Sequence, residues 1–162
     1  MNESFEFWNA LAPHHLALEN SFLDRPSLRR ILNKIHSPVL VVGAGQGLLM
    51  GELQRRNFEC DGVDLSSEMV RYAKVRRGLD LIQADARDMP FGKGTYKTII
   101  YATGVIDFMS DEEEIHAILT EGRRIANHPG IIFVAFYKIS VATVKLLRRL
   151  GLLQNNVFST SN

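Results

Sequence analysis

The feature that most constrains the fold is an uncharged run, Val39-Leu40-Val41-Val42, that ends in a glycine-rich turn. A short run of β-branched residues and leucine without polar alternation predicts a strand buried on both faces, as in a parallel sheet. The turn carries glycine at every second position: Gly43, Gly45 and Gly47. Leucines at helical spacing from Leu48 to Leu53 predict a helix directly after it. The backbone of such a turn can approach a ligand at the helix N-terminus, although a bare strand-turn-helix also favours glycine.

The remainder of the chain repeats this alternation of strand and helix. Further strands are predicted over residues 58–63, 79–84, 98–102 and 131–136. Helices are predicted between them, one capped by Ser66 and ended by Gly78, another opened by Ser110 and Glu113 and ended by Pro129-Gly130. Two more are predicted over residues 26–35 and 141–150. This α/β pattern predicts a parallel sheet with right-handed crossovers and helices on both faces.

Composition excludes several classes of protein. The 162 residues include 19 basic and 18 acidic side chains, a net charge of +1, which argues against a protein whose main role is to coat nucleic acid. The single cysteine, Cys60, excludes a disulfide framework and a cysteine-based zinc site, and scattered histidines predict no metal site. No apolar run reaches the roughly 20 residues that a membrane span needs, and the N-terminus lacks the pattern of a secretory signal. We therefore expect a soluble, cytoplasmic protein.

Acidic residues follow two further predicted strands. Asp64 lies 21 residues beyond Gly43, where a carboxylate can accept hydrogen bonds from ribose hydroxyls; the alternative is an acid that offsets a helix dipole. Asp85 ends the next strand, and there an adenine-binding acid and a solvated loop acid remain equal alternatives. The dinucleotide fingerprint G-x-G-x-x-G would need glycine where the chain has Leu48, which argues against a nicotinamide or flavin cofactor.

Three motifs in register resemble those of the class I S-adenosylmethionine-dependent methyltransferases. They are Val39 to Gly47, Gly62-Val63-Asp64-Leu65-Ser66-Ser67-Glu68-Met69, and Gln83-Ala84-Asp85-Ala86-Arg87-Asp88-Met89-Pro90-Phe91. The resemblance is to the small-molecule branch with ubiquinone- and menaquinone-biosynthesis-type enzymes, and it covers residues 32–137. It implies a Rossmann-like, doubly wound, mostly parallel sheet in the order 3-2-1-4-5.

The resemblance also implies S-adenosylmethionine as the cofactor and assigns its contacts. The matching positions are Gly43, Ala44, Gly45 and Gly47 around the methionine portion, Asp64 at the ribose, Leu65 and Met69 beside the adenine, Asp85 and Ala86 at its polar edge, and Ala102 and Thr103 near the transferable methyl group. Residues 1–36 would form an N-terminal lid and helix, and residues 37–162 the cofactor-binding domain.

The sequence identifies no decisive catalytic base, and a base is needed only when the acceptor must lose a proton. His15, in the expected lid, and Asp107, after the fourth strand, are the candidates; a surface histidine and a loop acid are the alternatives. The family usually has an acid at the positions of Val41 and Lys97. Because the first of these helps to organise the site around the cofactor's ammonium group, two functions stay open: methyl transfer to a small organic acceptor, and a non-catalytic module that binds the cofactor or a partner protein.

The end of the chain is too short for the antiparallel hairpin that completes the sheet in the resembling fold. That hairpin and its preceding helix need roughly 40 residues at usual element lengths, more than follow residue 141. The fifth strand, residues 131–136, carries no charge or proline and would be an open edge. We therefore expect either a shortened form of a longer protein or a homodimer formed through this edge.

Overall fold

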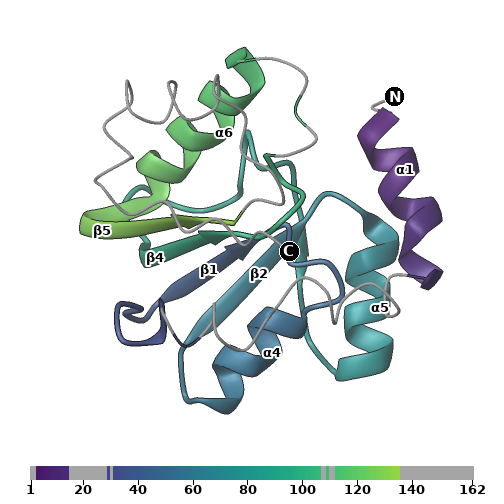
Figure 1. Cartoon of the computed structure of the whole chain (residues 1–162), viewed down its shortest axis with the longest axis horizontal. Helices are drawn as coiled ribbons and strands as arrows, with labels where there is room; N and C mark the ends of the chain where they lie inside the picture. Colours follow the sequence, from purple (N-terminus) through teal and green to yellow (C-terminus); the bar gives the residue numbers. More distant parts are fainter. Residues whose placement is uncertain (1–2, 15–28, 30, 107–108, 110–111, 136–162) are drawn as a thin grey trace.

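Five parallel strands form one sheet in the order β3-β2-β1-β4-β5 within the described part of the chain (Figure 1). The computed structural model describes residues 3–14, 29, 31–106, 109 and 112–135. The strands are β1 (Val39–Val42), β2 (Cys60–Asp64), β3 (Ile82–Gln83), β4 (Tyr96–Tyr101) and β5 (Ala126–Val134). The predicted doubly wound, Rossmann-like sheet order is confirmed.

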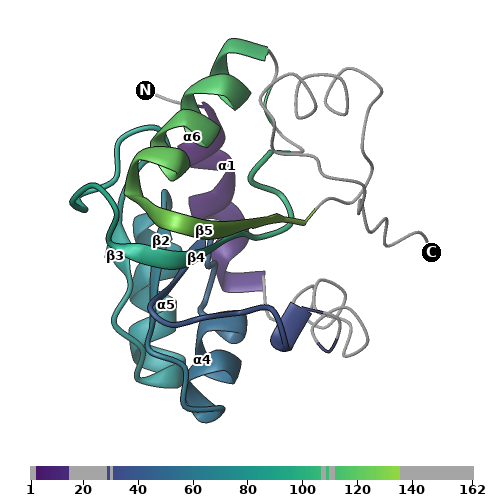
Figure 2. The ribbon, with the colours of Figure 1, turned by 90° about the vertical axis from the view of Figure 1, so that its left-hand side faces the viewer.

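Helices cover both faces of this sheet. Helices α4 (Leu48–Arg55) and α5 (Ser67–Arg77) lie on one face, and α6 (Glu112–Ile125) lies on the other, as Figure 2 shows. Strand β1 explains why both faces must be covered, because successive side chains of a strand point in opposite directions. Leu40 and Val42 belong to the core beneath α6, whereas Val39 and Val41 belong to the core beneath α4. All four are buried, so the uncharged run in the sequence marks the centre of the molecule.

The N-terminal residues pack on the outside of α5. Helix α1 (Glu3–Leu11) and the 3-10 turn η1 (Ala12–His14) lie alongside it (Figure 1). Of the helix predicted over residues 26–35, the described residues 29, 31 and 32 are helical. The helix predicted over 141–150 lies outside the described residues.

The third strand is shorter than predicted. Residues 79–84 were expected to form it, but only Ile82 and Gln83 pair with β2. Leu79 and Leu81 instead turn their side chains toward Gly47 of the glycine loop. Leu79 and Leu81 therefore pack against the glycine loop. Only Ile82 and Gln83 form parallel pairs with β2.

The boundary between α6 and β5 also differs from the prediction. Pro129-Gly130 was expected to end the helix, but α6 ends at Ile125 and β5 begins at the next residue. Ala126 pairs with Tyr96, and the ladder resumes only at Ile131, opposite Thr98. Residues 127–130 therefore form a bulge in this strand, where proline is tolerated because no ladder hydrogen bond is needed. The regular part of the ladder starts at Ile131, where the strand was predicted to start.

No helix in the described parts of the chain is long and apolar enough to cross a bilayer.

Candidate functional site

The glycine loop leaves the carboxyl end of β1 and leads into α4. Gly43, Gly45 and Gly47 all have left-handed backbone conformations, with φ of 69°, 56° and 83°. A side chain is strained at such angles, so the spacing of the glycines follows the backbone path. Ala44 donates its N–H to the Val63 carbonyl across 2.9 Å, which fixes the loop to β2.

Two of the three glycines are also required by close contacts within the protein. A Cβ atom at Gly43 would lie 2.2 Å from the Val105 Cγ2 atom, and one at Gly47 would lie 2.7 Å from the Leu79 Cδ1 atom. Val105 comes from the segment after β4 and is half-buried. Packing inside the chain therefore explains the absence of side chains at Gly43 and Gly47 without a ligand.

Asp64 joins the glycine loop to the end of β2. Its Oδ2 atom accepts the N–H of Gly45 across 2.7 Å, and its Oδ1 atom accepts the N–H of Ser66 across 2.9 Å. The residue is buried, with 9% of its surface exposed. Ser66 is the N-cap of α5, and its Oγ atom accepts the N–H of Met69, so Asp64 also lies at the positive end of that helix. The predicted cap of α5 is confirmed.

The second predicted acid, Asp85, forms a bidentate ion pair with Arg87. Arg87 donates its Nε to Oδ1 across 2.9 Å and its Nη2 to Oδ2 across 2.5 Å, and its backbone N–H also reaches Oδ1. These hydrogen bonds hold the pKa of Asp85 below its usual value. The carboxylate is therefore an ionised acceptor, and Oδ2, with one donor, has capacity for another. Ala86 beside it is half-buried against the core beneath α6.

The other predicted cofactor residues lie near the same edge of the sheet. Ala102 donates its N–H to the Val42 carbonyl across 2.9 Å, which places the segment of Ala102 and Thr103 beside the start of the glycine loop. Leu65 follows Asp64 directly, and Met69 lies in the first turns of α5 with 1% of its surface exposed. The segments that follow β1, β2, β3 and β4 thus carry the described residues of all the predicted cofactor-binding groups. The candidate bases His15 and Asp107 lie outside the described residues.

Val41 is completely buried in the core beneath α4, between Gly62 of β2 and Ile100 of β4. The core residues that it packs with include Ile35, Leu49 and Ile100. Lys97 lies near the start of β4 and is exposed.

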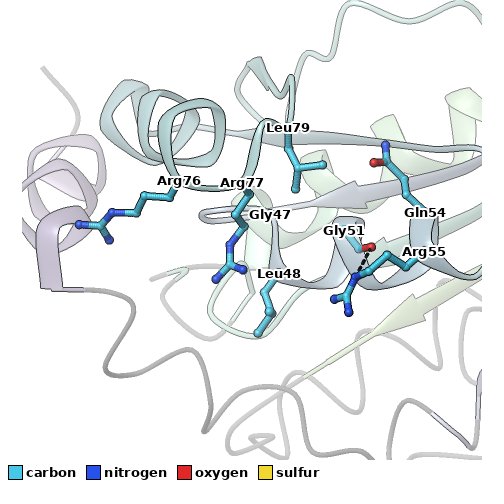
Figure 3. Close-up of a pocket in the computed structure, with 8 residues that line it drawn as sticks. All are labelled: Gly47, Leu48, Gly51, Gln54, Arg55, Arg76, Arg77 and Leu79. Atoms are coloured by element: carbon cyan, nitrogen blue, oxygen red, sulfur yellow. Dashed lines mark hydrogen bonds between the residues drawn. The ribbon is translucent and has the colours of Figure 1, made fainter.

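A groove between α4 and α5 begins at the glycine loop (Figure 3). It has a volume of about 660 Å³ and is lined by Gly47, Leu48, Gly51, Gln54, Arg55, Arg76, Arg77 and Leu79. Of the predicted site residues that the structure describes, only Gly47 lines it, so the groove adjoins the predicted cofactor site at the glycine loop. Among the described residues there is also no group of three or more His, Cys, Asp or Glu that could hold a metal ion.

Sequence reasoning gave no role to three side chains at this edge of the sheet. Arg87 could have been found, because an arginine two residues after an acid is a plausible ion-pair partner. Gln46 and Asn9 could not, because their contacts form only when the N-terminal segment packs on α5.

Comparison with known proteins agrees with this geometry. Residues 39–130 match the model of the methyltransferase domain family, and the chain belongs to that family. No curated protein sequence matches the chain. Among solved structures, one that is similar is a TehB-like SAM-dependent methyltransferase from Corynebacterium glutamicum, with 18% identity, a TM-score of 0.70, and 90% of this chain and 83% of that chain covered.

Two other solved structures are similar over shorter shares of their own length. A Pyrococcus horikoshii protein is 25% identical, with a TM-score of 0.63, and the match covers 80% of this chain and 62% of that one. A sugar N-methyltransferase from a Streptoalloteichus species is 23% identical, with a TM-score of 0.59, and the match covers 74% of this chain and 47% of that one. The chain thus spans about three fifths of the Pyrococcus protein and about half of the Streptoalloteichus enzyme.

Proposed function

We propose that this protein is an S-adenosylmethionine-dependent methyltransferase that acts on a small-molecule acceptor. The observation that carries the proposal is the contact between Gly45 and Asp64, which joins the glycine loop to the acid at the end of the neighbouring strand. The family match over residues 39–130 supports the class of reaction. The placement in the ubiquinone- and menaquinone-biosynthesis-like branch is supported by the sequence motifs alone.

The residues at this edge fit the adenosine portion of the cofactor. A carboxylate offers about four acceptor positions, so a ribose hydroxyl can join the backbone N–H groups of Gly45 and Ser66 on Asp64. Asp85, ionised by its pairing with Arg87, suits the donor character of an adenine amino group. The fit is poorer at the ammonium end of the cofactor, where an acid is replaced by the buried Val41.

The bound cofactor would supply a methyl group activated on a sulfonium, which an already nucleophilic acceptor can take without a base. The protein's own contribution is then to bind and orient. Asp64 would hold the ribose, and the glycine loop with Ala102 and Thr103 would line the methionine portion. Rigid positioning is available because the loop is fixed to β2 through both Ala44 and Gly45.

Two observations favour a small-molecule acceptor over nucleic acid. The net charge is +1, and the basic residues of α5 are engaged within the protein: Arg71 pairs with Glu68 across 2.7 Å and Lys74 with Asp80 across 2.6 Å. The similarity to a sugar N-methyltransferase also supports a small-molecule acceptor.

Val41 favours a second function, a domain that binds the cofactor or a partner protein without turnover. Its complete burial among apolar residues leaves the site without the acid that the family usually has there. This alternative retains the adenosine contacts and loses only the arrangement around the ammonium group.

Calorimetric titration with S-adenosylmethionine, S-adenosylhomocysteine and NAD tests the proposal. We expect both sulfur compounds to bind and NAD not to bind; tight binding of NAD alone would contradict the proposal. Methyl release from labelled S-adenosylmethionine across a mixed metabolite extract then separates the two functions. If the protein binds the cofactor but no methyl release is detected with any extract, the non-catalytic binding domain is favoured.

A further inference from the structure

We propose that Gln46 is a positioning residue that locks the glycine loop to the N-terminal segment, so that docking of this segment and binding of the methionine portion of the cofactor stabilise each other. The inference rests on the proposed function for the identity of the ligand. The docking itself is a property of the chain and can be measured without ligand.

Gln46 joins three elements through one side-chain amide. It lies between Gly45 and Gly47 and is completely buried. Its Nε2 atom donates to the Ala12 carbonyl of η1 across 2.5 Å, and its Oε1 atom accepts from Nη1 of Arg76, on α5, across 3.0 Å. A buried amide that loses its partners costs free energy, so this side chain favours the docked arrangement.

Arg76 closes the connection from the other side. Its Nη2 atom donates to the Pro13 carbonyl across 3.4 Å, and its guanidinium lies 4.1 Å from the centre of the Tyr72 ring. Figure 3 shows Arg76 extending toward the N-terminal segment. The cation is thus held by α5 in the position from which it reaches both Gln46 and the turn η1.

A second contact docks the same segment at the other end of α5. The Asn9 Oδ1 atom accepts from the Ser66 hydroxyl across 2.6 Å and from the Glu68 N–H across 3.2 Å. Ser66 in turn donates its backbone N–H to Asp64. The N-terminal segment therefore reaches both sides of the candidate site: the ribose side through Asn9 and the glycine loop through Gln46.

The coupling between docking of the N-terminal segment and binding of the cofactor follows from the position of Gln46 in the glycine loop. Its neighbours Gly45 and Gly47 lack side chains, so Gln46 supplies the side-chain anchor between them. If η1 left the glycine loop, the side-chain amide of Gln46 would lose the Ala12 carbonyl and would either stay buried without that partner or turn outward. Either change would alter the loop that carries the Gly45 N–H. A ligand that binds only the ordered loop therefore favours docking, and docking favours that ligand to the same extent.

Gln46→Ala in the full chain tests this inference, with Gln46→Glu as its isosteric partner. Gln46→Glu keeps the length and the acceptor for Arg76 but places an oxygen against the Ala12 carbonyl. Gln54→Ala is the matched control, because Gln54 also donates its amide to a backbone carbonyl, that of Cys60, away from the loop.

Two measurements separate docking from binding. Hydrogen exchange at the amides of Leu11, Ala12 and His14 reports docking without ligand. Calorimetry with S-adenosylhomocysteine and with adenosine reports binding with and without the methionine portion.

We expect both Gln46 variants to lose about tenfold in amide protection and about tenfold in affinity for S-adenosylhomocysteine, with adenosine changed less than about twofold. Protection and affinity equal to those of the wild type would overturn the inference. So would an equal loss for adenosine, which indicates a general structural role, or lost protection with unchanged affinity, which removes the coupling. If Gln46→Ala does not fold, Gln46→Glu decides. Failure of the wild type to bind either sulfur compound would overturn the proposed function, and with it the coupling to the cofactor.

Discussion

Gly45 and Asp64 are 19 residues apart in the sequence and are joined by a hydrogen bond of 2.7 Å from the Gly45 N–H to Oδ2 of Asp64. The contact connects the loop after β1 with the end of β2, and it is buried. The acid therefore has a structural role in the unliganded fold in addition to the role proposed at the ribose. A variant of Asp64 is expected to change stability as well as binding.

Asp64→Asn should lower the free energy of unfolding by roughly 1–3 kcal/mol. The carboxylate accepts one backbone N–H on each oxygen, from Gly45 and from Ser66, and an asparagine must turn its NH₂ group toward one of these donors. Urea denaturation measures the change, and calorimetry should show weaker adenosine binding. Asp80→Asn is the control, because Asp80 is exposed and pairs with Lys74 at the surface. Equal effects of the two variants would contradict this account.

Glu121→Gln should destabilise the protein by roughly 1–3 kcal/mol at neutral pH. Glu121 is buried on α6 and accepts the Met89 N–H across 2.8 Å and both Nε and Nη2 of Arg124 across 2.6 Å. It thereby ties the segment that carries Asp85 to this helix. Chemical denaturation at pH 7 measures the loss, and Glu113→Gln, exposed on the same helix, should leave stability nearly unchanged.

The same residue predicts a pH dependence. Hydrogen bonds from Arg124 hold the pKa of Glu121 below its ordinary value of 4.5. Because protonation is easier in the unfolded chain, the stabilisation is complete above about pH 4.5 and is lost as the pH falls through the lower folded pKa. The wild type should therefore lose stability more steeply below about pH 4.5 than Glu121→Gln. Parallel curves for the two proteins would show that this carboxylate does not contribute.

Gly122→Ala should destabilise the protein by about 3 kcal/mol, although alanine favours helices. A Cβ atom there would lie 2.1 Å from the Tyr101 hydroxyl oxygen, and Tyr101 is completely buried with its hydroxyl bonded to the Ile118 carbonyl across 2.8 Å. Tyr101→Phe removes that oxygen and leaves ring contacts of 3.1 and 3.3 Å. The double variant should regain about 1–2 kcal/mol relative to additivity in a denaturation cycle. Additive losses would refute the contact.

Val41→Asp should destabilise the fold by about 3 kcal/mol instead of restoring an acid to the site. Val41 has no exposed surface, and its core contains Ile35, Leu49 and Ile100. A thermal unfolding scan should show a lower Tm, and Val41→Thr, with nearly the same shape, should show a smaller loss. A stable Val41→Asp variant with tighter cofactor binding would show that the family's acid is tolerated here.

Sedimentation tests the predicted homodimer. Among the described strands β5 is the edge of the sheet, and its regular part, Ile131–Val134, carries no charge or proline. Of the two alternatives expected for this edge, a shortened form or a homodimer, the homodimer predicts a species of about twice 18.3 kDa at micromolar concentration that dissociates on dilution. A single species of 18.3 kDa at every concentration would contradict the dimer.

Local patterns in the sequence predicted much of this protein's fold. The uncharged run of β1 required burial on both faces, and the structure places Leu40 and Val42 beneath α6 and Val39 and Val41 beneath α4. The cap at Ser66 and the stop at Gly78 were also readable, because the atoms that form them are within a few residues of one another. The strand ends fixed the sheet edge at which Asp64 and the glycine loop meet, since parallel strands align their carboxyl ends.

Contacts between distant segments were decided only by the tertiary structure. Besides its left-handed backbone conformation, glycine at position 43 is required by Val105, 62 residues later in the chain, and the two share no pattern in the sequence. The short β3 and the bulge at residues 127–130 were likewise visible only in the pairing of the strands. Gln46 and Asn9 acquire partners only when η1 and α1 pack on α5. Periodicity and capping are local in the chain and determine the elements, whereas side-chain partners depend on which surfaces meet once those elements are packed.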